Sequence, residues 1–159
     1  MSNVMKSVFF LCTVLLSFAS FAQTDQKAKD EKLLKDYFAK NKIKATRTGS
    51  GLYYVITKKG SGENAKKGQM VAMNYLGKFM DGKKFDANVD DNFNNIRPFQ
   101  FTLGIGQVIQ GWDEGVQLLN PGSRATLYLP SGIAYGPSGR GPIPPNSVLV
   151  FDVEVLSAK

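Results

Sequence analysis

The sequence carries few of the side chains that usually perform acid–base, nucleophilic or metal chemistry. It has no histidine, and its only cysteine is Cys12. Histidine-dependent triads, cysteine–histidine nucleophiles and ordinary zinc sites are therefore excluded. Whatever chemistry the chain performs must run without them, on other candidate side chains.

A carboxylate among aromatic residues is the first of these candidates. Asp86 directly follows Phe85 in a chain with 11 phenylalanines, 6 tyrosines and 1 tryptophan. Burying a carboxylate among such rings is costly unless hydrogen bonds compensate it, so a functional role is one interpretation of Asp86. The other interpretation is that Asp86 caps a turn.

The stretch that begins at Asp86 also imitates a calcium-binding loop. Asp86, Asn88 and Asp90 have the required spacing. However, the sixth position is Asp91 where the loop needs glycine, and the twelfth is Arg97 where it needs glutamate. We therefore expect no metal site here.

A second imitation lies at residues 103–106, which read Leu-Gly-Ile-Gly and suggest a dinucleotide-binding loop. The third glycine is misplaced, at Gly111, and no strand–helix–strand unit surrounds the motif. We expect a turn at this place and no bound cofactor.

Five segments are predicted to be β-strands, because they are rich in β-branched and aromatic residues and are bounded by Gly, Pro, Asn or Asp. They are residues 52–58, 70–79, 98–103, 124–129 and 148–156. In the sequence between these segments, only the stretch from Val108 to Leu119 has the apolar period of a helix, and Pro121 ends it.

Short connections without repeated strand–helix alternation favour an antiparallel sheet. The fold class predicted is α+β, with a roughly five-stranded antiparallel sheet curled around one short helix.

Residues 1–22 have the layout of a secretory signal peptide. Lys6 precedes an apolar run from Val8 to Phe18, and small residues lead to a predicted cleavage after Ala22. A membrane anchor is disfavoured because the run is shorter than the roughly 20 residues that span a bilayer. A lipoprotein signal ending at Cys12 has too short an apolar stretch before it.

Residues 23–48 are predicted to form a charged helical arm and linker before a catalytic domain at residues 49–159. The arm helix is expected from Asp25 to Asn41, preceding the sheet. Its narrow apolar stripe either docks on the domain or pairs with a second copy. The stripe consists of Leu33, Leu34, Tyr37 and Phe38.

The chain is basic, with 20 lysines and arginines against 13 acidic residues. Such a balance can indicate nucleic-acid binding, but the lysines are dispersed or lie in the arm rather than alternating with exposed aromatic residues. We interpret the charge as a solvated surface and expect no nucleic-acid partner.

A series of motifs in order resembles the FKBP family of peptidyl-prolyl isomerases. The motifs are Gly77, residues 81–86, 98–101, 108–116, 134–136, 143–146 and 149–154. Gly51-Leu52-Tyr53 is similar to the domain entry of secreted bacterial members. The resemblance spans nearly everything after Gly49 and implies an FKBP-like fold and a bacterial cell-envelope setting.

The resemblance also implies a site, an aromatic pocket for a proline-containing substrate with Trp112 as its floor. Implied catalytic residues are Asp86, Tyr135, Trp112, Phe85 and Phe151. Implied substrate-binding residues are Tyr75, Phe99, Val108, Ile109 and Ile143, the last through its backbone. From the sequence alone, Trp112 and Phe99 could equally be ordinary core residues, because a small domain needs aromatic packing.

Isomerising an X-Pro bond needs no nucleophile, because it only rotates a bond with a barrier of about 20 kcal/mol. The leading hypothesis is an exported prolyl isomerase without a cofactor, acting on unfolded or folding polypeptides with exposed prolines. Macrolides of the rapamycin type are implied as inhibitors, and no membrane span is expected after signal cleavage. The alternatives are a client-binding module with little turnover and a dimeric chaperone held together by the arm.

The segment Ala87 to Arg97 departs from the smallest family members by several extra residues. It carries an apolar pair, Phe93 and Ile96. Either the pair extends the substrate contact, or the segment is a polar loop with two residues folded back. Ile133, where smaller members often have tyrosine, is a further departure.

Overall fold

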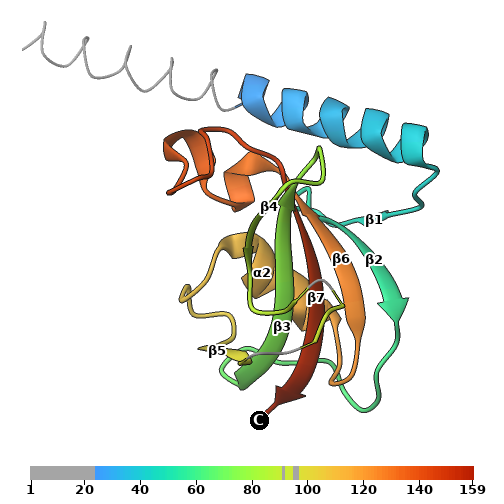
Figure 1. Ribbon diagram of the computed structural model, residues 1–159, viewed down its shortest axis with the longest axis vertical. Coiled ribbons are helices and arrows are strands. Elements are labelled where there is room, and N and C mark those ends of the chain that lie inside the picture. Colours follow the sequence, from blue (N-terminus) through green and yellow to red (C-terminus); the bar gives the residue numbers. More distant parts are fainter. Residues whose placement is uncertain (1–23, 91, 95–96) are drawn as a thin grey trace, which may run out of the picture.

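A computed structural model of the protein describes residues 24–90, 92–94 and 97–159 (Figure 1). The predicted signal peptide and Ile96 lie outside these residues. Among the helices in the described ranges, none combines the length and the apolar character that crossing a bilayer requires.

One antiparallel sheet organises the domain. Its strands are β1 (Thr46–Arg47), β2 (Tyr53–Lys58), β3 (Met70–Phe79), β4 (Lys84–Ala87), β5 (Phe99–Thr102), β6 (Arg124–Leu129) and β7 (Leu149–Ala158). They follow the order β1-β2-β6-β7-β3-β4, and β5 also pairs with β3. Every pairing is antiparallel, which confirms the predicted sheet type.

The five predicted strands are all present, as β2, β3, β5, β6 and β7, but the sheet has seven strands, so the predicted count was too low. Both additional strands are short. β1 has two residues, and β4 has four, of which Lys84 and Asp86 are charged. Neither has apolar alternation, and each is set by its neighbour, β1 by β2 and β4 by Leu76 to Lys78 of β3.

The central helix is shorter than the stretch over which its apolar pattern extends. Ile109 is extended, with φ −59° and ψ 147°, so α2 runs only over Gln110–Gly115 and continues as the 3-10 helix η1 (Val116–Leu118). Leu119 then returns to an extended conformation. Val108 and Ile109 therefore precede the helix instead of lying on it, which leaves them half-buried at its entrance.

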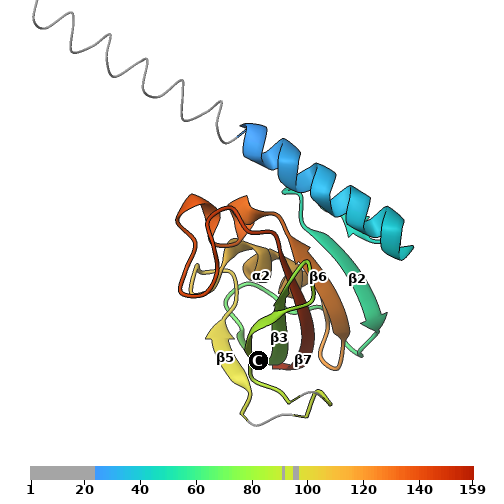
Figure 2. The ribbon, with the colours of Figure 1, turned by 45° about the horizontal axis from the view of Figure 1, so that its top comes forward.

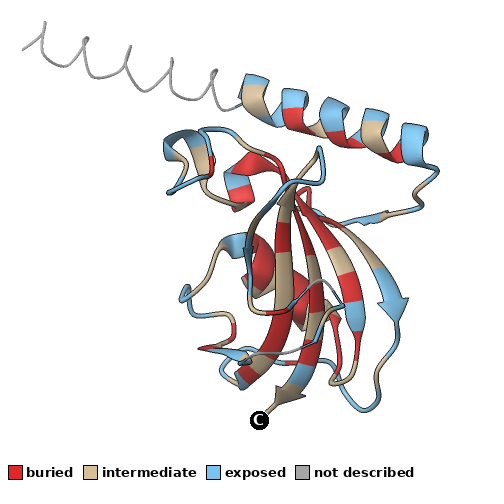
Figure 3. Cartoon of the chain, viewed as in Figure 1, coloured by how far each residue is buried: buried red, intermediate tan, exposed pale blue. Residues whose placement is uncertain are grey.

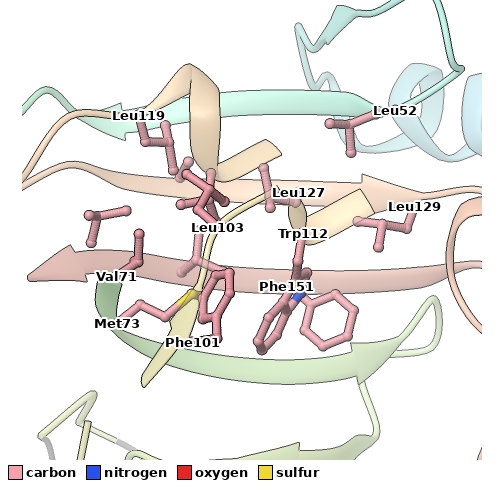
Figure 4. Packing of buried hydrophobic residues seen from close by; sticks show 14 of the residues in the cluster. Leu52, Val71, Met73, Phe101, Leu103, Trp112, Leu119, Leu127, Leu129 and Phe151 are labelled. Atoms are coloured by element: carbon pink, nitrogen blue, oxygen red, sulfur yellow. The ribbon is translucent and has the colours of Figure 1, made fainter. Parts of the chain in front are cut away.

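Alternation along the strands gives the sheet two apolar faces. On β6, Leu127 and Leu129 face α2 and join the main core, while Tyr128 faces the other side. On β7, Phe151 joins the main core and Val150 faces the other side. Figure 3 shows the resulting buried positions along the strands and on α2, and Figure 4 shows the packing of the main core.

The N-terminal helix, described from residue 24 to residue 41, covers the outer face of the sheet, opposite α2 (Figure 2). Leu34 is fully buried and Phe38 nearly so. They pack with Tyr53, Tyr128, Val148 and Val150. The stripe thus docks on its own domain, the first of the two predicted arrangements. Leu33, which the pattern assigned to the stripe, is 47% exposed and takes no part.

A polar cluster fixes the same helix to the first two strands. The Glu31 carboxylate accepts hydrogen bonds from the Tyr53 hydroxyl at 2.6 Å and from Arg47 Nε at 3.2 Å. Burial alone raises the pKa of Glu31, but the hydrogen bonds from Tyr53, Lys35 and Arg47 outweigh it and bring this pKa below its usual value. The helix is therefore held by a directional contact as well as by apolar packing.

Two adjacent leucines on this helix provide a matched test of its docking. Leu34→Ala should lower the free energy of unfolding by about 3 kcal/mol, because it leaves a cavity in the second core. Leu33→Ala makes the same change at an exposed position and should shift it by less than about 0.5 kcal/mol. Urea unfolding at several protein concentrations measures both, and equal effects of the two substitutions would contradict the docking.

Candidate active site

A hollow of about 510 Å³ opens beside α2, on the concave side of the sheet. Its lining comes from β3, β4, β5, the segment before α2, α2 itself and the loops before β7. The lining residues are Tyr75, Asp86, Phe99, Gly106, Gln107, Val108, Ile109, Trp112, Tyr135 and Arg140. Seven of the ten site residues predicted from the sequence lie in this list, although they come from positions 75 to 135 of the chain.

Trp112 is the deepest ring of the hollow, only 6% exposed. Its indole packs against Tyr75 at 4.9 Å between ring centroids, Phe151 at 5.1 Å and Phe99 at 5.8 Å, all edge to face. This geometry is the favourable one for aromatic pairs, and it holds the indole upright with one side toward the hollow. Figure 4 shows Trp112 and Phe151 side by side. Within the described residues, the buried Trp112 Nε1 has no hydrogen-bond partner.

Phe85, Phe151 and Ile143, the other three predicted residues, lie behind the lining. Phe151 is buried against Trp112, and Phe85 packs edge to face on Phe151 at 5.6 Å. Ile143 is buried, and its backbone N–H donates to the Arg140 carbonyl at 2.9 Å. These residues support the hollow instead of facing it, so the predicted polar contact from the Ile143 backbone is already made within the protein.

Gly77 makes this support possible. A Cβ at position 77 would lie 2.7 Å from the Phe85 ring and 2.8 Å from the Phe151 ring. These separations are too short for carbon atoms, so only glycine lets both rings lie directly on the β3 backbone. The glycine in the family motif is therefore explained by ring packing at this point.

The segment before α2 is fixed by Asp113, a residue to which sequence reasoning gave no role. Its carboxylate accepts the backbone N–H groups of Gly104 and Gly106, each at 2.8 Å. Both glycines have positive φ, 77° and 79°, so the predicted turn is real and is closed by a side chain four residues into the following helix region. This anchor sets the position of Val108 and Ile109.

Ile109 also carries a group that the sequence did not point to. It precedes α2, so its carbonyl accepts the N–H groups of Trp112 and Asp113. Within the described residues, its own N–H donates to no other group. Because Ile109 lines the hollow, this N–H is an available donor at its edge.

The polar rim consists of two tyrosines, Asp86 and Arg140. Asp86 is exposed, and its carboxylate accepts a hydrogen bond from the Tyr75 hydroxyl at 2.9 Å. The cost of burying this carboxylate among aromatic rings therefore does not arise. The turn-cap alternative is not what the structure shows either, since Asp86 lies within β4 and bonds to a tyrosine. The Arg140 guanidinium lies 5.8 Å from the centre of the Tyr135 ring.

Both phenols of the rim stay protonated at neutral pH. Burial, reinforced by the hydrogen bond to Asp86, raises the pKa of Tyr75 well above its usual value. Burial also raises the pKa of Tyr135, with Arg140 opposing the shift and the charge of Asp86 adding to it. The rim therefore presents neutral O–H groups.

Phe93, on the long loop after β4, is not among the residues that line the hollow. The Asn88 side chain ties this loop down by accepting the Tyr75 N–H and donating to the carbonyls of Met73 and Arg97. Phe93 lies against Arg124, 5.1 Å from its guanidinium. Phe93 therefore does not extend the substrate contact, and the folded-back alternative describes it. Asn88, Arg97 and Pro98 instead line a second hollow of about 430 Å³ that shares Tyr75 and Phe99 with the first.

Comparison with known proteins identifies the family of this chain. A family model described as FKBP-type peptidyl-prolyl cis-trans isomerase matches residues 61–156. The chain belongs to the FKBP-type peptidyl-prolyl cis-trans isomerase family. This match confirms the predicted resemblance to the FKBP family. The matched residues lie inside the proposed domain at residues 49–159.

Individual relatives of this chain support the same family assignment. The FKBP-type isomerase FkpA of Aeromonas hydrophila is 43% identical over 139 residues, 86% of this chain and 50% of the relative. FK506-binding protein 1 of Saccharomyces cerevisiae is 50% identical over 92 residues, 57% of this chain and 77% of the relative. The crystal structure of FkpA from Escherichia coli covers all of this chain and 74% of that chain, with a TM-score of 0.70 and 32% identity. This FKBP spans about half the length of the FkpA relatives from A. hydrophila and Neisseria meningitidis.

Asp113 and its neighbour Glu114 test the anchor before α2. Asp113→Asn should lower the free energy of unfolding by about 1–3 kcal/mol, because Gly104 and Gly106 donate to different carboxylate oxygens and the amide replaces one of these oxygens with an NH₂ group. The same substitution should weaken the binding of a proline peptide, read from the fluorescence of Trp112, by loosening Val108 and Ile109. Glu114→Gln is the control and should change neither quantity. Unaltered peptide binding by Asp113→Asn would show that the turn does not position the pocket.

Proposed function

We propose that this FKBP catalyses the cis/trans isomerisation of X-Pro bonds in polypeptides. One observation carries the proposal: a hollow with an indole floor and aromatic walls is bordered by neutral hydrogen-bond donors, the Tyr135 hydroxyl and the Ile109 N–H. Such a site fits a proline ring with a carbonyl on either side. The matching family model and the relatives named for the isomerase support the same activity.

The chemistry follows from moving the imide out of water. The planar form of an X-Pro bond has a polarised carbonyl that water stabilises, whereas the twisted form is less polarised and loses less on desolvation. An apolar pocket therefore lowers the roughly 20 kcal/mol barrier to rotation. Because each 1.4 kcal/mol is a factor of about ten, removing a third of the barrier brings a step of tens of seconds to milliseconds or less.

The structure favours a division of roles among the predicted residues. Trp112, Phe99 and Val108 hold the proline ring, with Phe85 and Phe151 as the support beneath. Tyr135 and the Ile109 N–H donate to the flanking carbonyls as the bond rotates.

Asp86, one of the implied catalytic residues, cannot act on a substrate carbonyl directly, because a carboxylate accepts hydrogen bonds and cannot donate one. It positions the Tyr75 ring that borders the floor.

The setting we propose is export from the cell. Residues 1–22 read as a signal peptide cleaved after Ala22, which leaves an arm at 23–48 and the isomerase domain at 49–159. Substrates would then be unfolded or folding envelope proteins with exposed prolines. Macrolides of the rapamycin type are proposed ligands of the same hollow, as the name of the yeast FK506-binding relative suggests.

The direct test is the cis-to-trans relaxation of a short proline peptide. The wild-type chain should accelerate it, and Trp112→Ala should reduce kcat/KM by about a hundredfold or more, because it removes the floor against which the twisted bond is desolvated. Ile105→Ala, at a position 54% exposed and outside the lining, is the control and should retain wild-type activity. No acceleration by the wild type would refute the proposed activity and favour a client-binding module.

The pH dependence of the same reaction is a second test. The chain has no histidine, and burial raises the pKa of both Tyr75 and Tyr135 above their usual value near 10, so no rim phenol ionises in the neutral range. We expect kcat/KM for an uncharged peptide to vary by less than about twofold between pH 6 and 8.5. A bell-shaped profile in this range would indicate an acid–base step that the proposed mechanism lacks.

A further inference from the structure

Asp30, on the N-terminal helix, is the only charged side chain that is buried among the described residues, with 3% exposure. Its Oδ2 accepts the Ser131 hydroxyl at 2.6 Å and the Ser131 N–H at 2.8 Å. Its Oδ1 accepts the side-chain amide of Gln26 at 2.7 Å. A buried carboxylate is tolerated only when its oxygens are satisfied in this way, so the contact is specific and joins residues 101 positions apart.

Ser131 begins the 3-10 helix η2 (Ser131–Ile133), which directly follows β6 and Pro130. The first N–H groups of a helix have no partner within it, and a side chain just before the helix usually supplies the acceptor. The residue in that place is Pro130, and η2 has no side-chain cap of its own. The Asp30 carboxylate supplies the missing acceptor from a different part of the chain.

The capped turn leads directly into the pocket. The Ala134 N–H donates to the Ser131 carbonyl at 3.0 Å, and the next residue is Tyr135, a wall of the hollow. On its other side η2 meets α2, because a Cβ built on Gly111 would lie 3.2 Å from the Ile133 carbonyl. Gly111 immediately precedes Trp112. The same turn thus ends two residues before the wall, Tyr135, in the chain and packs on the residue that precedes the floor, Trp112.

We propose that Asp30 is a positioning residue of the active site, which makes the N-terminal helix part of the catalytic apparatus through η2 and Tyr135. This inference rests on the proposed isomerase function and adds to it a residue outside the domain predicted to hold the activity. The sequence motifs shared with the family do not include Asp30, and its partner Ser131 lies just ahead of the motif at 134–136.

The other contacts of the helix provide the matched control. Leu34 packs with Tyr53, Tyr128 and Val150 on the outer face of the sheet, away from the hollow. Leu34→Ala therefore loosens the same helix without removing the acceptor from Ser131. Asp30→Asn is the conservative variant. Its single amide oxygen can accept both Ser131 groups, as Oδ2 does, while Gln26 turns its own oxygen toward the new NH₂ group.

The experiment measures two quantities on the full chain under conditions where circular dichroism shows every variant folded. One is hydrogen exchange of the backbone in residues 130–136, and the other is the kcat and KM for a short proline peptide. Asp30→Ala should speed the exchange about tenfold or more and lower kcat/KM about fivefold to tenfold, mainly by raising KM. Asp30→Asn should stay within about twofold of wild type in each quantity, and Leu34→Ala should keep kcat/KM within about twofold.

Three results would overturn the inference. They are wild-type exchange in Asp30→Ala, faster exchange with unchanged kcat/KM, and an equal loss of activity in Leu34→Ala. If Asp30→Ala does not fold, Ser131→Ala removes the 2.6 Å hydroxyl contact and should shift both quantities in the same direction, and wild-type values would refute the link. An inactive wild-type chain refutes the proposed function instead. The exchange of Asp30→Ala still decides the anchor in that case, with faster exchange supporting it and wild-type exchange overturning it.

Discussion

The edge-to-face packing of Trp112 against its ring neighbours is the contact on which the rest of the site depends. An indole that lies flat in a core would leave no hollow above it. Here Phe151, Tyr75 and Phe99 all pack against it edge to face, and Phe85 packs in turn on Phe151. That support requires the Phe85 ring to rest on the β3 backbone, which only the glycine at position 77 allows. One missing side chain thus sets the depth of the pocket.

The sheet that carries these rings is buried on both faces, and this gives a small domain more core than one layer would. Residues after the predicted cleavage site contain no cysteine, so no disulfide can contribute to stability there. The main core lies between the sheet and α2, and the second core forms where Leu34 and Phe38 cover Tyr53, Tyr128 and Val150. The N-terminal helix is therefore a structural layer of the domain and not only an appendage to it.

Local patterns in the sequence were sufficient for the long strands, the helical arm and the lining of the site. Alternation and aromatic content located β3 and β6 to the residue, and the motif order identified the family and with it Trp112, Tyr75 and Tyr135. What could not be predicted depends on contacts between distant segments. β1 and β4 exist through pairing with a neighbour, and α2 begins late because Ile109 is held extended. Asp113 and Asp30 look like ordinary helix carboxylates until the fold brings Gly104, Gly106 and Ser131 to them.

In the proposed mechanism, the site acts through its surroundings rather than through a group that gains or loses a proton. In most enzymes the titrating residues have to be placed, whereas here the essential placement is of rings, one free N–H and two phenols that stay neutral. This explains how a chain without histidine can hold an active site. It also explains why so much of the fold serves as support, because a pocket that acts by excluding water must keep its shape while a bond turns inside it. Asp113, within α2, fixes the segment that leads to Ile109, and Asp30, on the N-terminal helix, fixes the turn that leads to Tyr135. Together they fix the two segments that carry the Ile109 N–H and the Tyr135 hydroxyl.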